Sequence, residues 1–127
     1  MSDKENQTLS TKKTDLPIMG KPVRGSKSGQ PIMVLFDLLG RRWAMGILWN
    51  LSSCNRTFRD LQLQCDSASP SVLNTRLKEL RAVGLIEKAT GGYSLTMDGR
   101  ALFSHLEPLG DWASEWAPKL TGNVENQ

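Results

Sequence analysis

The sequence has 127 residues, 39% of them hydrophobic and 23% charged, with a net charge of +3, which favours one ordered domain over a disordered chain. No run of about 18 apolar residues could span a membrane, and the polar N-terminal residues lack the apolar core of a signal peptide. Because two cysteines, Cys54 and Cys65, are too few for a disulfide scaffold or a four-ligand zinc site, we expect a reduced cytoplasmic protein with no metal or other cofactor.

Residues 1–30 contain six basic and three acidic residues, and their prolines and glycines interrupt any helical periodicity. We expect a flexible basic arm here, which either adds phosphate contacts or serves as a solubility tail. Residues 41–81 are also basic, with seven basic and three acidic residues, whereas residues 82–127 carry three basic and six acidic ones. This asymmetry favours a polyanion as the partner over chance clustering of surface charge.

Two apolar helices are predicted next. The first spans residues 31–39, beginning with a proline and ending before Gly40. The second spans residues 41–51. Its inner face should carry Trp43, Ile47, Leu48 and Leu51.

Residues 57–84 have the outline of a helix-turn-helix motif. A short amphipathic helix follows Thr57, residues 66–68 form a turn, and a longer helix begins after the capping Ser69 and ends at Gly84. The longer helix would be the recognition helix. Its apolar residues have the spacing of a buried stripe: Val72, Leu73, Leu77, Leu80 and Val83. Its outward side chains are types that bind base edges and phosphates: Ser71, Asn74, Thr75, Arg76 and Lys78. We expect Glu79 and Arg81 at the groove edge or in solvent.

After Gly84 the apolar period changes from helical to alternating. Residues 85–96 are predicted to form a hairpin wing, with strands over 85–89 and 93–96 and a tight turn at Gly91 and Gly92. A long amphipathic helix is predicted over residues 97–117. The chain thus divides into the arm (1–30), a winged helix-turn-helix domain (31–118) and a frayed tail (119–127). The fold class is mainly α with a small β-hairpin.

Motifs for catalysis are absent from the sequence. His105 is the only histidine, and a histidine in a leucine-rich helix is more often structural than a general base. The pair Gly91 and Gly92 precedes a strand and not a helix, so it is not a phosphate-binding loop. Cys65 is expected to pack inward as a small hydrophobe. We therefore expect no enzymatic activity.

Several segments in order carry a family resemblance: residues 39–43 (LGRRW), 47–48 (IL), 56–61 (RTFRDL), 69–80 (SPSVLNTRLKEL), 84–86 (GLI), 93–96 (YSLT) and 99–100 (GR). With these segments, residues 38–116 resemble the HxlR-type family of bacterial winged helix-turn-helix transcriptional regulators, relatives of the MarR group. The resemblance implies a homodimer that binds double-stranded DNA, with its two recognition helices in successive major grooves of a pseudopalindromic operator. Such a protein would be associated with the nucleoid.

The resemblance also implies that the first and last helices form the dimer interface, which would contain Ile32, Leu35, Leu106, Leu109, Trp112 and Trp116. These helices carry more large apolar residues than so small a domain needs internally. We expect phosphate contacts from Arg41, Arg42, Arg56 and Arg59. Base-edge and nearby contacts should come from Ser69, Ser71, Asn74, Thr75, Arg76 and Lys78.

Two departures from the family pattern affect these expectations. Many members carry a cysteine just before the proline that opens the first helix, whereas this chain has Gln30, so thiol sensing by that route is not supported. The wing turn, residues 90–92, is shorter than usual.

Two alternative functions stay open. One is a protein-interaction module without specific DNA binding, which the zero net charge of residues 31–127 favours. The other is a regulator gated by a small-molecule effector in an aromatic pocket around Trp43, Trp112 and Trp116.

Overall fold

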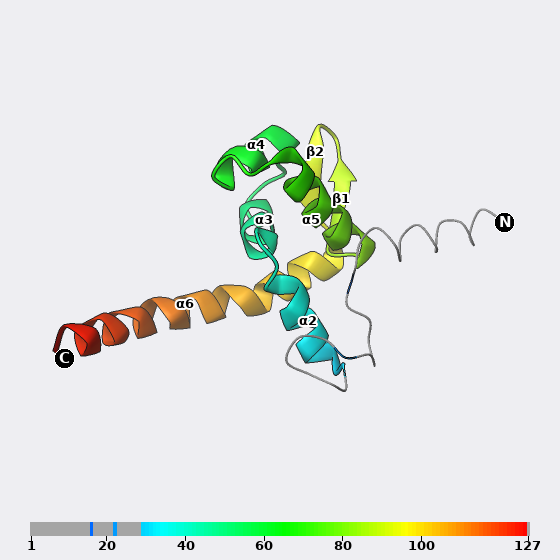
Figure 1. Cartoon of the computed structure of the whole chain (residues 1–127). Helices are drawn as coiled ribbons and strands as arrows, with labels where there is room; N and C mark the ends of the chain where they lie inside the picture. The colour runs from blue at the N-terminus through cyan, green and yellow to red at the C-terminus, as the bar shows by residue number, and fades with distance from the viewer. Residues whose placement is uncertain (1–15, 17–21, 23–28, 127) are drawn as a thin grey trace.

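The computed structural model of the chain describes residues 16, 22 and 29–126, with side chains as far as residue 120 (Figure 1). Most of the expected basic arm lies outside these described residues. Within them the chain forms five helices and one antiparallel hairpin, which confirms the mainly α winged-helix fold. The elements are α2 (Pro31–Leu39), α3 (Ala44–Leu51), α4 (Phe58–Gln64), α5 (Pro70–Ala82), β1 (Ile86–Ala89), β2 (Gly92–Leu95) and α6 (Met97–Asn126).

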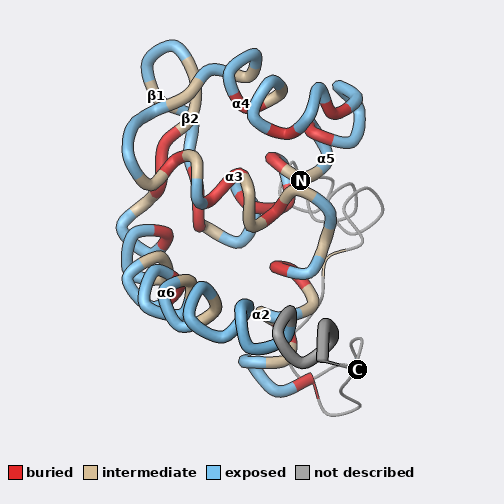
Figure 2. Tube along the Cα trace, turned by 90° about the vertical axis from the view of Figure 1, so that its left-hand side faces the viewer, coloured by how far each residue is buried: buried red, intermediate tan, exposed pale blue. Residues whose placement is uncertain are grey.

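Helix α3 begins later than the sequence predicts. Trp43 has a left-handed backbone, with φ of 73°, so residues 41–43 form a turn and the helix starts at Ala44. Trp43 is consequently only partly buried, whereas the other three predicted inner residues of this helix are buried. In Figure 2 the buried positions concentrate along α3, at the centre of the domain.

The helix-turn-helix forms at the predicted positions because both helices have capping side chains. The backbone N–H of Asp60 donates to Oγ1 of Thr57 at 3.0 Å, and the N–H of Thr57 donates back to the Asp60 carboxylate at 3.3 Å, which makes a capping box. Oγ of Ser69 accepts from the N–H of Val72 at 3.3 Å at the start of α5. Between the helices, Gln62 Nε2 donates to the carbonyl of Ala68 at 3.0 Å and closes the turn.

The buried face of α5 is narrower than the predicted stripe. Its core side chains, spaced by four and three residues, are Leu73, Leu77 and Leu80. Val72 and Val83 are 36% and 40% exposed, so their predicted burial is wrong. The prediction for Glu79 is also wrong, because this carboxylate is buried and not at the groove edge or in solvent.

The hairpin forms as predicted, and it is joined to the segment before α4. Ile86 pairs with Leu95 and Ala89 with Gly92 in the antiparallel register. Arg56 and Tyr93 then exchange backbone hydrogen bonds of 3.1 and 2.8 Å, which adds an isolated bridge beside β2. These two segments of the backbone approach so closely that a Cβ at Gly92 would collide with the carbonyl oxygen of Arg56.

Helix α6 is longer than predicted. It continues through Pro118 to Asn126, so the segment expected to fray is helical as far as residue 126. Its first half packs beside α3, where Trp49 meets Phe103 edge to face at 5.0 Å, and its second half extends away from the domain (Figure 1). Among the described residues, no helix has the length and apolar character needed to cross a membrane.

Candidate nucleic-acid interface

The outer face of α5 is polar and is not covered by the rest of the described chain. Ser71, Asn74, Thr75 and Lys78 are exposed, as is the capping Ser69. Oγ1 of Thr75 donates to the carbonyl of Ser71 at 2.9 Å, so this hydroxyl is held against its own helix. Together these side chains offer hydroxyl, amide and ammonium groups at one surface, the chemistry that contacts bases and phosphates in a major groove.

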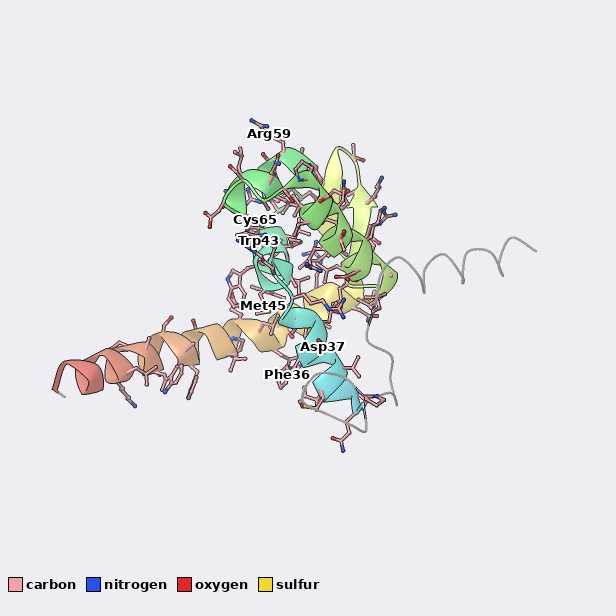
Figure 3. The ribbon with its side chains drawn as sticks, in the orientation of Figure 1. Phe36, Asp37, Trp43, Met45, Arg59 and Cys65 are labelled. Carbon is pink, nitrogen blue, oxygen red and sulfur yellow. The ribbon has the colours of Figure 1, made fainter. Side chains whose placement is uncertain are left out.

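Two of the five predicted arginines are exposed cations. Arg59 points outward from α4 at the edge of the molecule (Figure 3). Arg42 lies in the turn before α3, where its guanidinium carbon is 4.9 Å from the centre of the Trp43 ring. This cation–π contact holds the side chain over the ring and leaves Arg42 exposed.

The predicted contacts Arg41 and Arg76 instead meet at Glu79. Nη1 of Arg41 donates to Oε2 of Glu79 at 2.6 Å, and Nη1 of Arg76 donates to Oε1 at 2.7 Å. The Glu79 side chain is only 2% exposed, and the two arginine side chains are 18% and 14% exposed. Nε of Arg76 also donates to the carbonyl oxygen of Arg42 at 2.6 Å. These guanidinium groups therefore face the protein.

Arg56 is likewise used within the loop between α3 and α4. Its Nε donates to the carbonyl of Asn50 at 3.1 Å and its Nη2 to Oγ of Ser53 at 3.4 Å. Its backbone carries the bridge to Tyr93. The Arg56 side chain is thus hydrogen-bonded within the protein, unlike the exposed side chains of Arg42 and Arg59.

An open groove of about 420 Å³ lies between α5 and β1, lined by Lys78, Arg81, Ala82, Ile86, Glu87 and Lys88. Three of these side chains are cationic, and one is acidic. Arg81 was predicted at the groove edge or in solvent, and no role was predicted for Lys88. The spacing of Lys78 and Arg81, three residues apart on one helix, was the available signal for half of this groove.

The predicted dimer residues fall into two groups. Ile32, Leu109, Trp112 and Trp116 are 51%, 55%, 56% and 45% exposed, large values for apolar side chains. Leu106 is buried in the chain's own core, and Leu35 packs against that core. Phe36, which was not among the predicted dimer residues, is also 53% exposed on α2. We call Ile32, Phe36, Leu109, Trp112 and Trp116 the apolar face.

The aromatic residues of the predicted ligand pocket have different neighbours. Trp112 stacks on Trp116, with ring centroids 5.4 Å apart and planes 20° apart, on the extending half of α6. Trp43 lies instead beneath Arg42, near the helix-turn-helix (Figure 3). The two cysteines also differ: Cys54 is exposed, whereas burial, with a smaller effect from the charge of Asp66, raises the pKa of the Cys65 thiol.

Comparisons with known proteins identify the family of the chain. Residues 38–121 match the family model described as HxlR-like helix-turn-helix. YvaP of Bacillus subtilis, named as an HTH-type transcriptional regulator, is 32% identical over 87 residues, covering 63% of this chain and 81% of the relative.

Solved structures give the same fold. Quinone-bound YodB from Bacillus subtilis is 30% identical with a TM-score of 0.61, over 66% of this chain and 96% of that one. A MarR-family regulator from Enterococcus faecalis, 23% identical, has a TM-score of 0.62 over 78% of this chain and 96% of that one, which shows the fold alone. The family resemblance is confirmed: the chain belongs to the HxlR-like family of DNA-binding helix-turn-helix transcriptional regulators.

Proposed function

We propose that the protein acts in the cytoplasm as a homodimer on a pseudopalindromic operator, with α5 of each subunit in one of two successive major grooves. One observation carries this proposal: the polar face of α5 and the apolar face of α2 and α6 are both exposed on the same chain. A second copy that covers the apolar face would present two recognition helices related by twofold symmetry.

The proposed DNA contacts are the exposed members of the predicted set. Asn74 would pair with a base edge, with Ser71, Thr75 and Lys78 beside it and Ser69 at the N-terminus of α5. Arg42 and Arg59 would contact phosphates. The cationic groove of Lys78, Arg81 and Lys88 would lie along the DNA backbone next to the short wing.

The proposed dimer interface is centred on the apolar face. Covering five large exposed side chains would remove apolar surface from water, the dominant favourable term in association. Leu35 and Leu106 would support this interface from beneath, because both pack against the core of their own subunit. We also infer that the protein acts without catalysis, since its relatives are named as regulators.

Selection of bound sites from a random duplex pool tests the proposal. We expect enrichment of two inverted half-sites with centres about 10–10.5 base pairs apart, or a multiple of that distance. Asn74→Ala should relax preference at one position in each half-site by roughly 1–3 kcal/mol. Arg59→Ala should instead lower affinity for all duplexes and reduce the salt slope by about 0.9 per lost phosphate contact.

If the protein binds no duplex with an affinity that falls steeply as salt concentration rises, DNA binding is contradicted. That result would favour the alternative of a protein-interaction module. A single half-site without an inverted partner would contradict only the dimeric arrangement.

A second candidate function, gating by a small aromatic effector, draws support from the similarity to quinone-bound YodB and from the exposed Trp112–Trp116 stack. Addition of a benzoquinone should then lower operator affinity and quench tryptophan fluorescence. Cys54→Ser separates reversible stacking from attack by the exposed thiol, because only the latter needs Cys54. If the quinone changes neither operator affinity nor tryptophan fluorescence in the wild type and in Cys54→Ser, quinone gating is excluded.

A further inference from the structure

A polar connection joins the first helix of the domain to the recognition helix. On α2, Asp37 lies 3.9 Å from Nη2 of Arg41, and Arg41 binds one oxygen of the buried Glu79. The other oxygen binds Arg76, which also donates to the carbonyl of Arg42. Glu79 and Arg76 are one turn apart on α5, whereas Arg41 is 38 residues away in sequence. We call these four residues, Asp37, Arg41, Arg76 and Glu79, the ion network.

The geometry of the ion network restricts how α5 can sit. Each oxygen of Glu79 has its own guanidinium, and Arg76 uses two of its nitrogens on two different acceptors. Rotation or sliding of α5 against the α2–α3 turn would break the bond from Arg41 to Glu79 and the bond from Arg76 to the Arg42 carbonyl. It would leave one oxygen of the buried carboxylate without its donor, so such movement is opposed. A planar guanidinium that donates from two nitrogens to two acceptors, as Arg76 does, also fixes a direction, which the compact ammonium group of lysine does less well.

The position of the network gives it a consequence for DNA recognition. Asp37 follows directly after Phe36, a member of the apolar face, and Arg76 lies between the exposed Thr75 and Lys78 on the recognition helix. The network therefore connects the helix that carries Ile32 and Phe36 of the apolar face to the helix that carries the proposed DNA contacts.

We propose that Arg76 and Glu79 are positioning residues, which set the orientation of α5 relative to the dimer interface and thereby the separation of half-sites that the dimer accepts. Arg76 does not contact DNA in this arrangement. The inference rests on the proposed homodimer and refines it by naming the residues that determine operator spacing.

The test uses Arg76→Lys in the full chain, because lysine keeps the charge but has one nitrogen where arginine uses two, Nε toward the Arg42 carbonyl and Nη1 toward Glu79. Duplexes carrying the selected half-sites are compared at separations changed one base pair at a time. Discrimination between the best and neighbouring separations should fall by about fivefold or more, the lower end of typical coupling between sites. The salt slope should not change, since no phosphate contact is lost.

Arg100→Lys is the matched control, because it makes the same exchange at an exposed arginine that lies outside both the ion network and the proposed DNA contacts. It should leave spacing preference unaltered. Arg41→Lys perturbs the network from its other end and should broaden the range of accepted half-site separations as Arg76→Lys does. If circular dichroism shows that Arg76→Lys does not fold, Arg41→Lys still provides the test.

Unaltered spacing in the folded network variants would overturn the proposal. So would a reduced salt slope or relaxed preference at one base in Arg76→Lys, because both indicate direct contact. Failure of the wild-type protein to select paired half-sites would instead contradict the proposed function.

Discussion

At the scale of single residues, the turn before the recognition helix holds two consecutive residues in a strained conformation. Asp66 and Ser67 have φ of 51° and 57°, the left-handed region that costs an L-residue roughly 1–2 kcal/mol. Glycine adopts it freely but loses about 0.5–1 kcal/mol of chain entropy. We predict that Ser67→Gly raises the free energy of unfolding by up to about 1 kcal/mol, measured by urea denaturation.

Ser104→Gly is the control for that substitution, because Ser104 is exposed within helix α6. There glycine brings no relief of strain and should cost about 0.5–1 kcal/mol. Destabilisation by both glycine variants would contradict the argument that the turn is strained.

The buried thiol of Cys65 should make stability depend on alkaline pH. Burial, aided by the charge of Asp66, raises its pKa, so the folded state favours the neutral thiol. Its contribution is complete below the pKa of an unfolded cysteine, about 8.5, and is lost as pH rises through the higher folded value. We predict a steeper fall in unfolding free energy above about pH 8.5 for the wild type than for Cys65→Ala.

Urea denaturation of both proteins across this pH range measures the difference. Equal slopes in the wild type and Cys65→Ala would show that the thiol does not titrate differently in the folded state.

Spacing in the sequence identifies the outward positions of α5 but not the partners of its charges. Arg76 and Glu79 are three residues apart, a separation that a surface ion pair also shows. The third member, Arg41, comes from another part of the chain, and no periodicity connects it to Glu79. The exposure of Asn74 and Lys78 was predictable, because each directly follows a leucine of the buried stripe. The inward direction of the Arg41 and Arg76 side chains was not predictable, because it depends on Glu79 as their shared partner.

At the scale of elements, the wing depends on one glycine. Gly92 begins β2, and a Cβ there would overlap the backbone at Arg56 and Thr57. We predict that Gly92→Ala lowers the free energy of unfolding by about 3 kcal/mol or more, at the upper end for overpacking, because the hairpin must move away from that loop. Thermal and urea denaturation provide the measurement.

Gly91→Ala is the matched control, since a Cβ at Gly91 would meet nothing within 4 Å although its φ is +76°. Left-handed strain alone should cost roughly 1–2 kcal/mol. A loss as large as that of Gly92→Ala would contradict the role assigned to the close approach.

The order and type of all seven described elements followed from local signals: apolar period, capping residues and the Gly91–Gly92 turn. The errors in helix bounds lie at Trp43 and Pro118. Trp43 has good helical spacing, yet it adopts a left-handed backbone beneath Arg42. Pro118 was expected to end α6, because a proline inside a helix removes an N–H and crowds the preceding turn, but the helix continues through it.

At the scale of the whole molecule, the apolar face should determine assembly. We predict that Trp112→Glu raises the dimer dissociation constant at least about tenfold, since it places a charge where a large aromatic side chain would be buried. Sedimentation equilibrium measures this constant directly.

Ser114→Glu adds the same charge at an exposed position two residues further along α6, about 200° around the helix. It should leave the dimer intact. A monomeric wild type, or equal weakening by both variants, would contradict the proposed interface.

The bridge between Arg56 and Tyr93 has a consequence for hydrogen exchange. Each residue donates its amide proton to the other's carbonyl, at 3.1 and 2.8 Å. Breaking one of these two hydrogen bonds distorts the other, so both bonds should open together. One opening event should therefore govern both protons, and they should exchange at similar rates. Because Arg56 directly precedes the cap of α4, that event would also loosen the first turn of this helix. The wing and the helix-turn-helix would then behave as one cooperative unit, and their slowest exchanging amides would report one shared opening free energy.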